Sequence, residues 1–162
     1  MLHQGLRLRW ISPEKGYGLF ASAFIPKGTL TFVNDDLDII LENNDPKITK
    51  EPYRSVIDKY AYTNSLGQKV ICWDLGKYMN HCCESNSMTT GFGFDIALRD
   101  IPENEEVTTD YGVFTITHEM TMSCKNPACR KRLDIRLFDQ LVPVWDQKIK
   151  EALQSFEKVP SP

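Results

Sequence analysis

Residues 77–86 read KYMNHCCESN, and this stretch decides how the rest of the chain is interpreted. An asparagine, a histidine and two adjacent cysteines crowd together with neither helical nor strand periodicity, which indicates a buried or functional loop. One interpretation is a Cys–His nucleophile pair with Cys82 or Cys83 as the nucleophile. Neighbours in sequence rarely have the geometry that such a pair needs, however, and no third group that would orient the histidine is evident.

Three further motifs lie around this loop. Residues 14–20 read EKGYGLF, where two glycines flank an aromatic residue and let the backbone approach a ligand. A dinucleotide-binding turn would need a third glycine and a following helix, so on its own this motif also fits a simple hairpin turn. Residues 101–112 read IPENEEVTTDYG, which predicts a turn and a short strand. Residues 124–130 read CKNPACR, two cysteines around a proline-containing turn of the kind that zinc sites use.

The rest of the sequence predicts a mainly β protein with peripheral helices. Short β-prone runs separated by turn residues occur at 6–10, 29–33, 37–41, 69–73 and 88–98, the last as a strand or a hairpin. Apolar residues at helical spacing predict a helix over 49–61, with Thr49 as its N-cap. A second helix is predicted over 143–156, with Pro143 as its first residue. Its simplest role is to pack over the cysteine-containing segment before it.

The composition narrows the possible compartments and partners. The chain has 162 residues, of which 41% are hydrophobic and 25% charged, as in ordinary globular domains. We expect no membrane association, because no apolar run approaches ~20 residues and no signal-peptide pattern opens the chain. The net charge of -3 disfavours direct nucleic-acid binding. Five cysteines without an export signal favour free thiols or a metal site, and hence a cytoplasmic or nuclear location.

The order of the motifs is more specific than any one of them. A Gly-x-Gly turn, an Asn-His-x-Cys loop, a Glu-Glu-x-Thr-x-Asp-Tyr strand end and a Cys-x4-Cys-Arg segment follow one another. In this order the chain resembles a SET-domain protein-lysine methyltransferase over residues 6–133, most like the small single-domain SET proteins. The resemblance implies a fold of several small sheets with knot-like threading, in which residues 110–111 pass near the loop at 80–86. It divides the chain into a SET domain at 1–117, a post-SET-like cysteine segment at 118–133 and a helical extension with tail at 134–162.

The resemblance also implies roles for individual residues. S-adenosylmethionine would donate methyl groups to a lysine side chain of a protein substrate, and Tyr111 matches the catalytic tyrosine of the family. The implied cofactor-binding positions are Lys15, Gly16, Tyr17, Gly18, Tyr78, Asn80, His81 and Tyr111. The implied substrate channel contains Tyr62, Thr109 and Phe114.

Two features of this channel bear on the chemistry. The family commonly has Phe or Tyr where this chain has Thr109, so we expect a roomier channel and higher methylation states unless Tyr62 or Phe114 fills the gap. The attacking amine must be neutral, and deprotonating a lysine at pH 7 costs roughly 4–5 kcal/mol. A dry aromatic channel reduces this cost by desolvation. We expect Tyr111 to orient the amine rather than to act as a general base.

The post-SET resemblance further implies one structural zinc ion. Cys83, Cys124 and Cys129 match three of the four usual cysteine ligands. The fourth position is Met122, a thioether that zinc rarely accepts. His118, Cys82 or solvent would then complete the shell, and the alternative is three reduced thiols without metal.

Three functions stay open at this point. The favoured one is a lysine methyltransferase acting on a histone-like tail or another basic protein, and the acidic residues at 35–45 form either a docking surface for it or a solvated loop. The second is a catalytically inactive SET module that binds peptides or chromatin proteins, which the retention of Asn80, His81 and Tyr111 disfavours. The third is a thiol enzyme. The sequence names neither the target nor the oligomeric state, and delivery into a host cell stays open.

Overall fold

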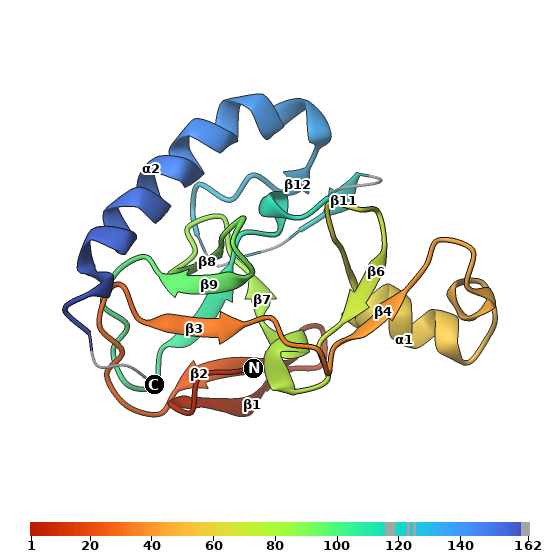
Figure 1. The fold of residues 1–162 in the computed structure, drawn as a ribbon, viewed down its shortest axis with the longest axis horizontal. Coiled ribbons are helices and arrows are strands. Elements are labelled where there is room, and N and C mark those ends of the chain that lie inside the picture. The colour runs from red at the N-terminus through yellow and green to blue at the C-terminus, as the bar shows by residue number, and fades with distance from the viewer. Residues whose placement is uncertain (116–118, 123, 125, 160–162) are drawn as a thin grey trace.

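Short strands dominate the architecture. A computed structural model describes residues 1–162 except 116–118, 123, 125 and 160–162 (Figure 1). Its strands are β1 (Leu6–Ser12), β2 (Gly16–Ala21), β3 (Leu30–Val33), β4 (Ile39–Leu41), β5 (Tyr62–Thr63), β6 (Lys69–Ile71), β7 (Asn80–His81), β8 (Ser87–Thr89), β9 (Phe94–Ala97), β10 (Glu106–Thr109), β11 (Met120–Thr121) and β12 (Arg132–Leu133). Its helices are α1 (Tyr53–Tyr60) and α2 (Phe138–Phe156), and short 3-10 turns lie at Pro46–Ile48, Leu75–Tyr78, Tyr111–Val113 and Ile135–Leu137.

The sheet with strand order β1-β2-β10-β7 gathers three of the sequence motifs. β1 and β2 form an antiparallel hairpin, and β10 joins β2 with Val107 opposite Leu19. β10 also pairs in parallel with β7, so that Thr108 lies opposite Asn80 and Thr109 opposite His81. The expectation that the chain near residue 110 passes beside the Asn-His loop is therefore confirmed, while knot-like threading stays a prediction.

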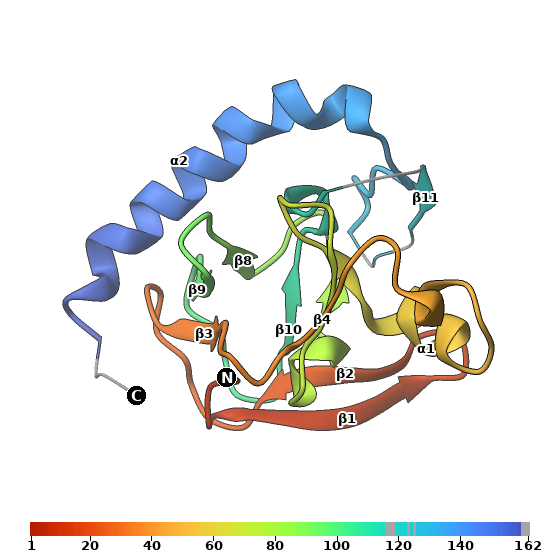
Figure 2. The same ribbon diagram turned by 45° about the vertical axis from the view of Figure 1, so that its right-hand side comes forward.

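A second sheet, β3-β9-β8, carries the long helix on one side. β8 and β9 are the hairpin that residues 88–98 predict. α2 runs along this side of the molecule, away from the β1–β2 hairpin (Figures 1 and 2). The core between helix and sheet contains Met88, Ile96, Leu98, Trp145 and Ala152. The helix thus packs over the main sheets and not only over the cysteine-containing segment.

The start predicted for the first helix is wrong. Helix α1 begins at Tyr53, whereas Thr49 ends the 3-10 turn at Pro46–Ile48. The residue before a proline is sterically disfavoured in the helical conformation, so Glu51 cannot carry a helix into Pro52. Ile57 is the buried residue of this helix, and the remaining apolar side chains of the predicted stripe are at least partly exposed.

The start predicted for the second helix is also wrong. Helix α2 begins at Phe138 and contains Pro143 in its interior, where a proline costs one backbone hydrogen bond. Leu141 and Val142 precede the proline and pack against the same core as Trp145. Burial of this extra turn is the physical reason that the helix extends past the proline, since tertiary packing overrides local propensity.

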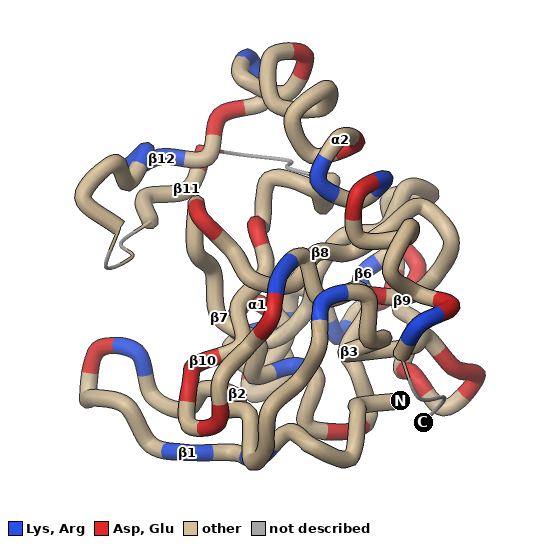
Figure 3. The backbone as a smooth tube through the Cα atoms, turned by 90° about the vertical axis from the view of Figure 1, so that its left-hand side faces the viewer, with Lys and Arg blue, Asp and Glu red and all other residues tan. Residues whose placement is uncertain are grey.

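Charges of both signs are interspersed along the chain, and α2 carries both (Figure 3). Several acidic side chains of the segment at 35–45 form hydrogen bonds within the fold. Asp35 accepts a hydrogen bond from the Trp73 indole at 3.0 Å, Asp38 accepts one from the Trp73 amide at 3.1 Å, and Asp45 caps the 3-10 turn that follows it. These contacts favour a structural loop over a docking surface. Neither described helix combines the length and the apolar character that crossing a bilayer requires.

Candidate active site

Tyr111 stands at the end of β10, where the chain turns sharply. Its hydroxyl donates a hydrogen bond to the Met79 carbonyl oxygen at 2.7 Å. Burial raises the pKa of Tyr111 to about 12. The phenol is therefore neutral at pH 7 and acts as an oriented hydrogen-bond donor rather than as a base.

His81 lies behind Tyr111 and is buried. Its Nδ1 accepts a hydrogen bond from the Tyr111 backbone N–H at 3.1 Å, so the proton of the neutral ring is assigned to Nε2. That nitrogen lies 3.2 Å from Cys83 Sγ. Burial lowers the pKa of His81 to about 4, so the ring is neutral at pH 7. One imidazole thus joins the backbone of Tyr111 to a cysteine of the predicted metal site.

Asp110 is buried and accepts several hydrogen bonds, a role that the sequence did not predict. Its carboxylate accepts hydrogen bonds from the Gly112 amide at 3.0 Å, from the Trp145 indole at 3.0 Å and from the Arg130 guanidinium. A Cβ atom on Gly112 would lie only 2.7 Å from the Trp145 ring, so the glycine is needed for this approach. The Asp-Tyr motif marks Asp110 as a candidate site residue. The sequence gives no sign that Trp145 contacts it, because Trp145 is predicted only as one residue of an apolar stripe.

The Gly-x-Gly turn and the Asn-His loop meet directly. Asn80 Nδ2 donates hydrogen bonds to the Tyr17 carbonyl oxygen at 3.1 Å and to Glu106 at 3.0 Å. A Cβ atom on Gly18 would lie 2.8 Å from Asn80 Nδ2, whereas the Cβ side of Gly16, whose φ is +73°, is open. The glycines therefore allow one close contact and leave one open face, as a cradle for a ligand requires.

Tyr78 extends this region as part of an aromatic row. Its ring meets that of Tyr17 edge-on at 5.9 Å and that of Tyr60 at 5.3 Å. Lys15 begins the turn, and its backbone N–H is held by the Ser12 hydroxyl at 3.2 Å. The positions that the resemblance assigns to the cofactor thus lie around the strand pairs β2–β10 and β10–β7.

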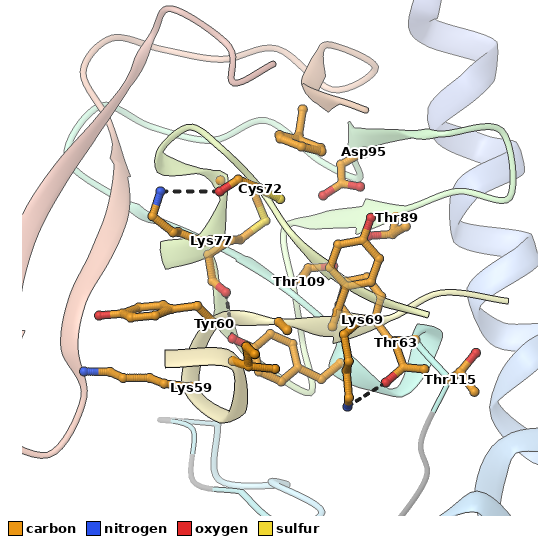
Figure 4. A pocket seen from close by; sticks show the side chains of 18 of the residues that line it. Lys59, Tyr60, Thr63, Lys69, Cys72, Lys77, Thr89, Asp95, Thr109 and Thr115 are labelled. Carbon is orange, nitrogen blue, oxygen red and sulfur yellow. Dashed lines mark hydrogen bonds between the residues drawn. The ribbon is translucent and has the colours of Figure 1, made fainter. Parts of the chain in front are cut away.

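Tyr111 also lines a cavity of about 520 Å³. Figure 4 shows this cavity from close by. Tyr62, Thr109 and Phe114, the three predicted channel residues, line it together with Tyr111. The Phe114 ring lies 4.9 Å from that of Tyr62 and 6.0 Å from that of Tyr111. Residues 15–18 and Asn80 do not line this cavity, so the two sets of predicted residues occupy separate faces.

Two residues of the cavity were missed by sequence reasoning. Asp95 on β9 and Cys72 after β6 line it, and both are buried. Burial raises the pKa of Asp95 to about 6 and that of Cys72 to about 12. Asp95 lies within a β-prone run, and nothing local indicates that its side chain faces a cavity rather than solvent.

The predicted metal ligands also come together. Cys83 Sγ lies 3.9 Å from Cys129 Sγ, and the ligand atoms of His81, Cys83 and Cys124 lie within 4.8 Å of one another. Burial raises the pKa of Cys83 to about 11, whereas a hydrogen bond from the Lys131 backbone is the main cause that lowers the pKa of Cys129 to about 7. His118, one candidate for the fourth ligand, lies outside the described residues.

This geometry disfavours the thiol-enzyme interpretation. Burial holds the thiols of Cys82 and Cys83 in their protonated form by raising their pKa values. His81 accepts its hydrogen bond from Tyr111 and directs its other nitrogen, which carries the proton, toward Cys83. A nucleophilic cysteine needs the opposite arrangement, with a basic nitrogen facing the thiol.

Comparison with known proteins identifies the family. A family model described as the SET domain matches residues 16–112, more than half of the chain. The chain therefore belongs to the SET-domain family, as the order of its motifs predicts, and its small sheets have the SET-like fold.

Its similarity to individual proteins is distant. The Variant-silencing SET domain-containing protein of Plasmodium falciparum (isolate 3D7) is 29% identical over 134 residues, an alignment that covers 72% of this chain and 5% of that protein. The chain thus corresponds to a small part of this relative.

Solved structures share the fold at low identity. The structure of Arabidopsis thaliana SUVH6 in complex with SAM has a TM-score of 0.59 and 19% identity, over 82% of this chain and 33% of that one. KRYPTONITE in complex with mCHH DNA, H3(1-15) peptide and SAH has a TM-score of 0.55 and 18% identity, over 82% and 30%. The methyltransferase domain of the human histone-lysine N-methyltransferase SETMAR has a TM-score of 0.54 and 18% identity, over 82% and 59%.

Proposed function

We propose that the chain transfers methyl groups from S-adenosylmethionine to a lysine side chain of a basic protein substrate. The observation that carries this proposal is that Tyr111 contacts both groups of site residues. Its backbone N–H donates to His81, next to Asn80, whose bond to the turn at 15–18 marks the first face. Tyr111 also lines the cavity with Tyr62, Thr109 and Phe114, which is the second face. Such an arrangement suits a donor and an acceptor that enter from opposite sides.

The residues on the first face fit the cofactor. The open side of Gly16 and the close approach of Gly18 to Asn80 leave backbone groups accessible beside an exposed aromatic residue, Tyr17. When bound, S-adenosylmethionine supplies an electrophilic methyl group. The SUVH6 and KRYPTONITE structures, which hold SAM and SAH, support this choice of cofactor.

The residues on the second face prepare the acceptor. The aromatic walls of Tyr62 and Phe114 exclude water, and desolvation lowers the pKa of an entering lysine. The Tyr111 hydroxyl donates its own proton to the Met79 carbonyl oxygen, so its oxygen accepts a hydrogen bond from the amine and orients it. The proton that the lysine ammonium loses leaves to water. In-line displacement depends on this positioning more than on any base.

On this proposal the product is a lysine that carries more than one methyl group. Thr109 leaves the cavity open, and Phe114, whose ring is tilted by 32° against that of Tyr62, does not close it. Mass spectrometry of the product measures the number of methyl groups, and we expect Thr109→Phe to reduce it.

A structural zinc ion fits the cysteine cluster as a further part of the proposal. Cys83, Cys124 and Cys129 offer three thiols, and Cys82 is the neighbour of Cys83 in the sequence and a candidate for the fourth ligand. His81 fits less well as the fourth ligand, because binding through Nε2 would put the proton on Nδ1, which accepts the Tyr111 N–H. Metal analysis of Cys82→Ser tests whether Cys82 is the fourth zinc ligand, and we expect this variant to lose zinc. Cys72→Ser, in the separate cavity, is the control and should retain zinc.

The proposal is tested by titrating the purified chain with S-adenosylmethionine in a calorimeter. We expect the wild type to bind and Gly18→Ala to bind at least about tenfold more weakly, because the new Cβ would lie within 3 Å of Ile11, Asn80 and Glu106 and force these side chains to shift. Gly91→Ala is the matched control, since nothing lies within 4 Å of its Cβ position. Mass spectrometry of histones and cell extracts treated with protein and cofactor then identifies the substrate. Absence of cofactor binding far above physiological concentrations would contradict the proposed methyltransferase function. The remaining hypothesis would then be an inactive SET module.

A further inference from the structure

The cavity contains a buried carboxylate that the proposed methyl transfer does not use. Asp95 lies on β9, the central strand of its sheet, opposite Phe32 on β3 and Thr89 on β8. The residue is only 6% exposed, yet it lines the cavity. Figure 4 shows Asp95 and Thr89 close together on one wall.

This carboxylate forms no ion pair with another described residue. Its neighbour across the sheet on β8 is the neutral residue Thr89. Three lysines line the cavity, and each is engaged elsewhere. Lys69 Nζ donates to the Thr63 hydroxyl at 2.9 Å, Lys77 Nζ donates to the Trp73 carbonyl oxygen at 3.2 Å, and Lys59 Nζ lies over the Tyr60 ring, 5.1 Å from its centroid. A buried charge without a partner is costly, which indicates that a ligand supplies the partner.

A second polar group on the same cavity also lacks a partner. The hydroxyl of Thr109 is buried and has no hydrogen-bond partner among the described residues, although the residue is only 2% exposed. Buried polar groups in folded proteins are nearly always hydrogen-bonded, so an unsatisfied one calls for a missing ligand. Asp95 and Thr109 reach the cavity from different strands, β9 and β10, and they identify the cavity independently.

We propose that this cavity binds a second basic side chain of the substrate, a lysine or an arginine near the methylated lysine, whose charged group pairs with Asp95. This inference deepens the proposed function and rests on it for the identity of the substrate. The apolar walls, which include Phe32, Ile57 and Met79, suit the methylene stem of such a side chain. A cavity of about 520 Å³ also exceeds what one lysine stem fills.

The methylated lysine itself is a poor partner for Asp95. A neighbouring carboxylate stabilises the ammonium form, whereas the attacking amine must be neutral. A second cation avoids this conflict, because it keeps its charge throughout the reaction. Asp95 is thus a specificity residue that selects basic sequences around the acceptor.

The first test measures fragment binding, which requires no methyl transfer. Ligand-observed NMR compares n-butylguanidinium and n-butylammonium with neutral n-butanol, using the wild type, Asp95→Asn and Asp58→Asn. Asp58 also lines the cavity, but its side chain is 62% exposed and pairs with Arg54, so it is the matched control. We expect the wild type and Asp58→Asn to prefer a cation over butanol by at least about tenfold, and Asp95→Asn to lose the preference. Absence of the preference in the wild type, or its persistence in Asp95→Asn, overturns the proposal.

The second test uses peptides with one fixed central lysine and a single flanking position occupied by arginine, lysine or norleucine. We expect the wild type to show a higher kcat/KM with a basic residue at one flanking position, and this ratio to fall to about one in Asp95→Asn. An unchanged ratio in Asp95→Asn overturns the proposal. If no peptide or protein is methylated at all, the proposed function fails, while the fragment measurement still decides whether Asp95 binds a cation.

Discussion

The two sides of Tyr111 differ in how their polar groups are satisfied. Behind the tyrosine, His81 and Asp110 are buried with several hydrogen bonds, which reach Cys83, Arg130 and Trp145. On the cavity side, neither a hydrogen-bond partner for the Thr109 hydroxyl nor an ion-pair partner for Asp95 occurs among the described residues. The hydrogen bonds behind the tyrosine hold Tyr111 in place, although Arg130 Nε has no partner among the same residues, and the cavity side is available to a ligand. This difference separates residues that maintain the structure from residues that recognise a substrate.

The largest expected effect comes from the bonded side. Asp110→Asn removes the charge that pairs with Arg130, whose side chain is only 18% exposed. It also places the NH₂ group of asparagine among N–H groups that all donate to the carboxylate. Loss of one partner of a buried ion pair costs about 3–5 kcal/mol in free energy of unfolding. Chemical denaturation measures this loss. Asp58→Asn, at the exposed pair with Arg54, should cost less than about 1 kcal/mol, and equal effects of the two variants would contradict the role assigned to Asp110.

Tyr111→Phe removes the hydroxyl that bonds to Met79 on the cavity side. We expect methyl transfer to fall by about 100-fold or more, since loss of one oriented hydrogen-bonding group at a reacting centre has effects of this size. Binding of S-adenosylmethionine should be unchanged within about twofold, because the phenol hydroxyl bonds to Met79 on the cavity side. Rate assays and calorimetry measure the two quantities. A parallel loss of binding and rate would instead indicate a structural role.

Asp95→Asn should stabilise the folded chain at neutral pH. Burial raises the pKa of Asp95 from 3.8 to about 6, so the folded state binds more protons than the unfolded state between these values. Stability due to this group therefore falls as pH rises through that window and stays low above it. A shift of about two units corresponds to roughly 3 kcal/mol at most.

The measurement is the difference in unfolding free energy between wild type and Asp95→Asn across pH 4 to 8. The comparison with the variant is needed because His81, whose pKa is lowered to about 4, contributes a slope of the opposite sign. The difference should be small near pH 4 and should grow until about pH 6. If the difference in unfolding free energy does not vary with pH, the raised pKa assigned to the buried Asp95 carboxyl is wrong.

The smallest effect is expected at the cofactor face. Asn80→Ala removes hydrogen bonds to Tyr17 and Glu106 and should weaken S-adenosylmethionine binding by about tenfold, or ~1.4 kcal/mol. Calorimetric titration measures the change. Asn104→Ala, at an exposed turn that bonds to Arg9, provides a control for asparagine removal away from the face and should bind the cofactor normally. Normal binding by Asn80→Ala would remove this residue from the cofactor site.

Local patterns predicted much of the fold. The strand at 6–10 and the hairpin at 88–98 are confirmed, because alternation and turn residues act over neighbouring positions. The predicted helix starts at Thr49 and Pro143 are wrong, since the steric effect of Pro52 and the burial of Leu141 were stronger than capping preferences. Residues from four motifs were predicted to meet, and the described structure brings Asn80 to Tyr17, Tyr111 to His81 and Cys83 to Cys129.

The sequence by itself determined the family and the residues that carry its chemistry, because their identity and order are properties of the chain. Only the tertiary structure decided which polar groups find partners. The two nitrogens of His81 reach Tyr111 and Cys83, Asp110 reaches Arg130 and Trp145, and Asp95 lines a cavity without an ion pair to any described residue. The physical reason is that hydrogen bonding and desolvation depend on atoms that are distant in sequence, and folding alone brings these atoms together.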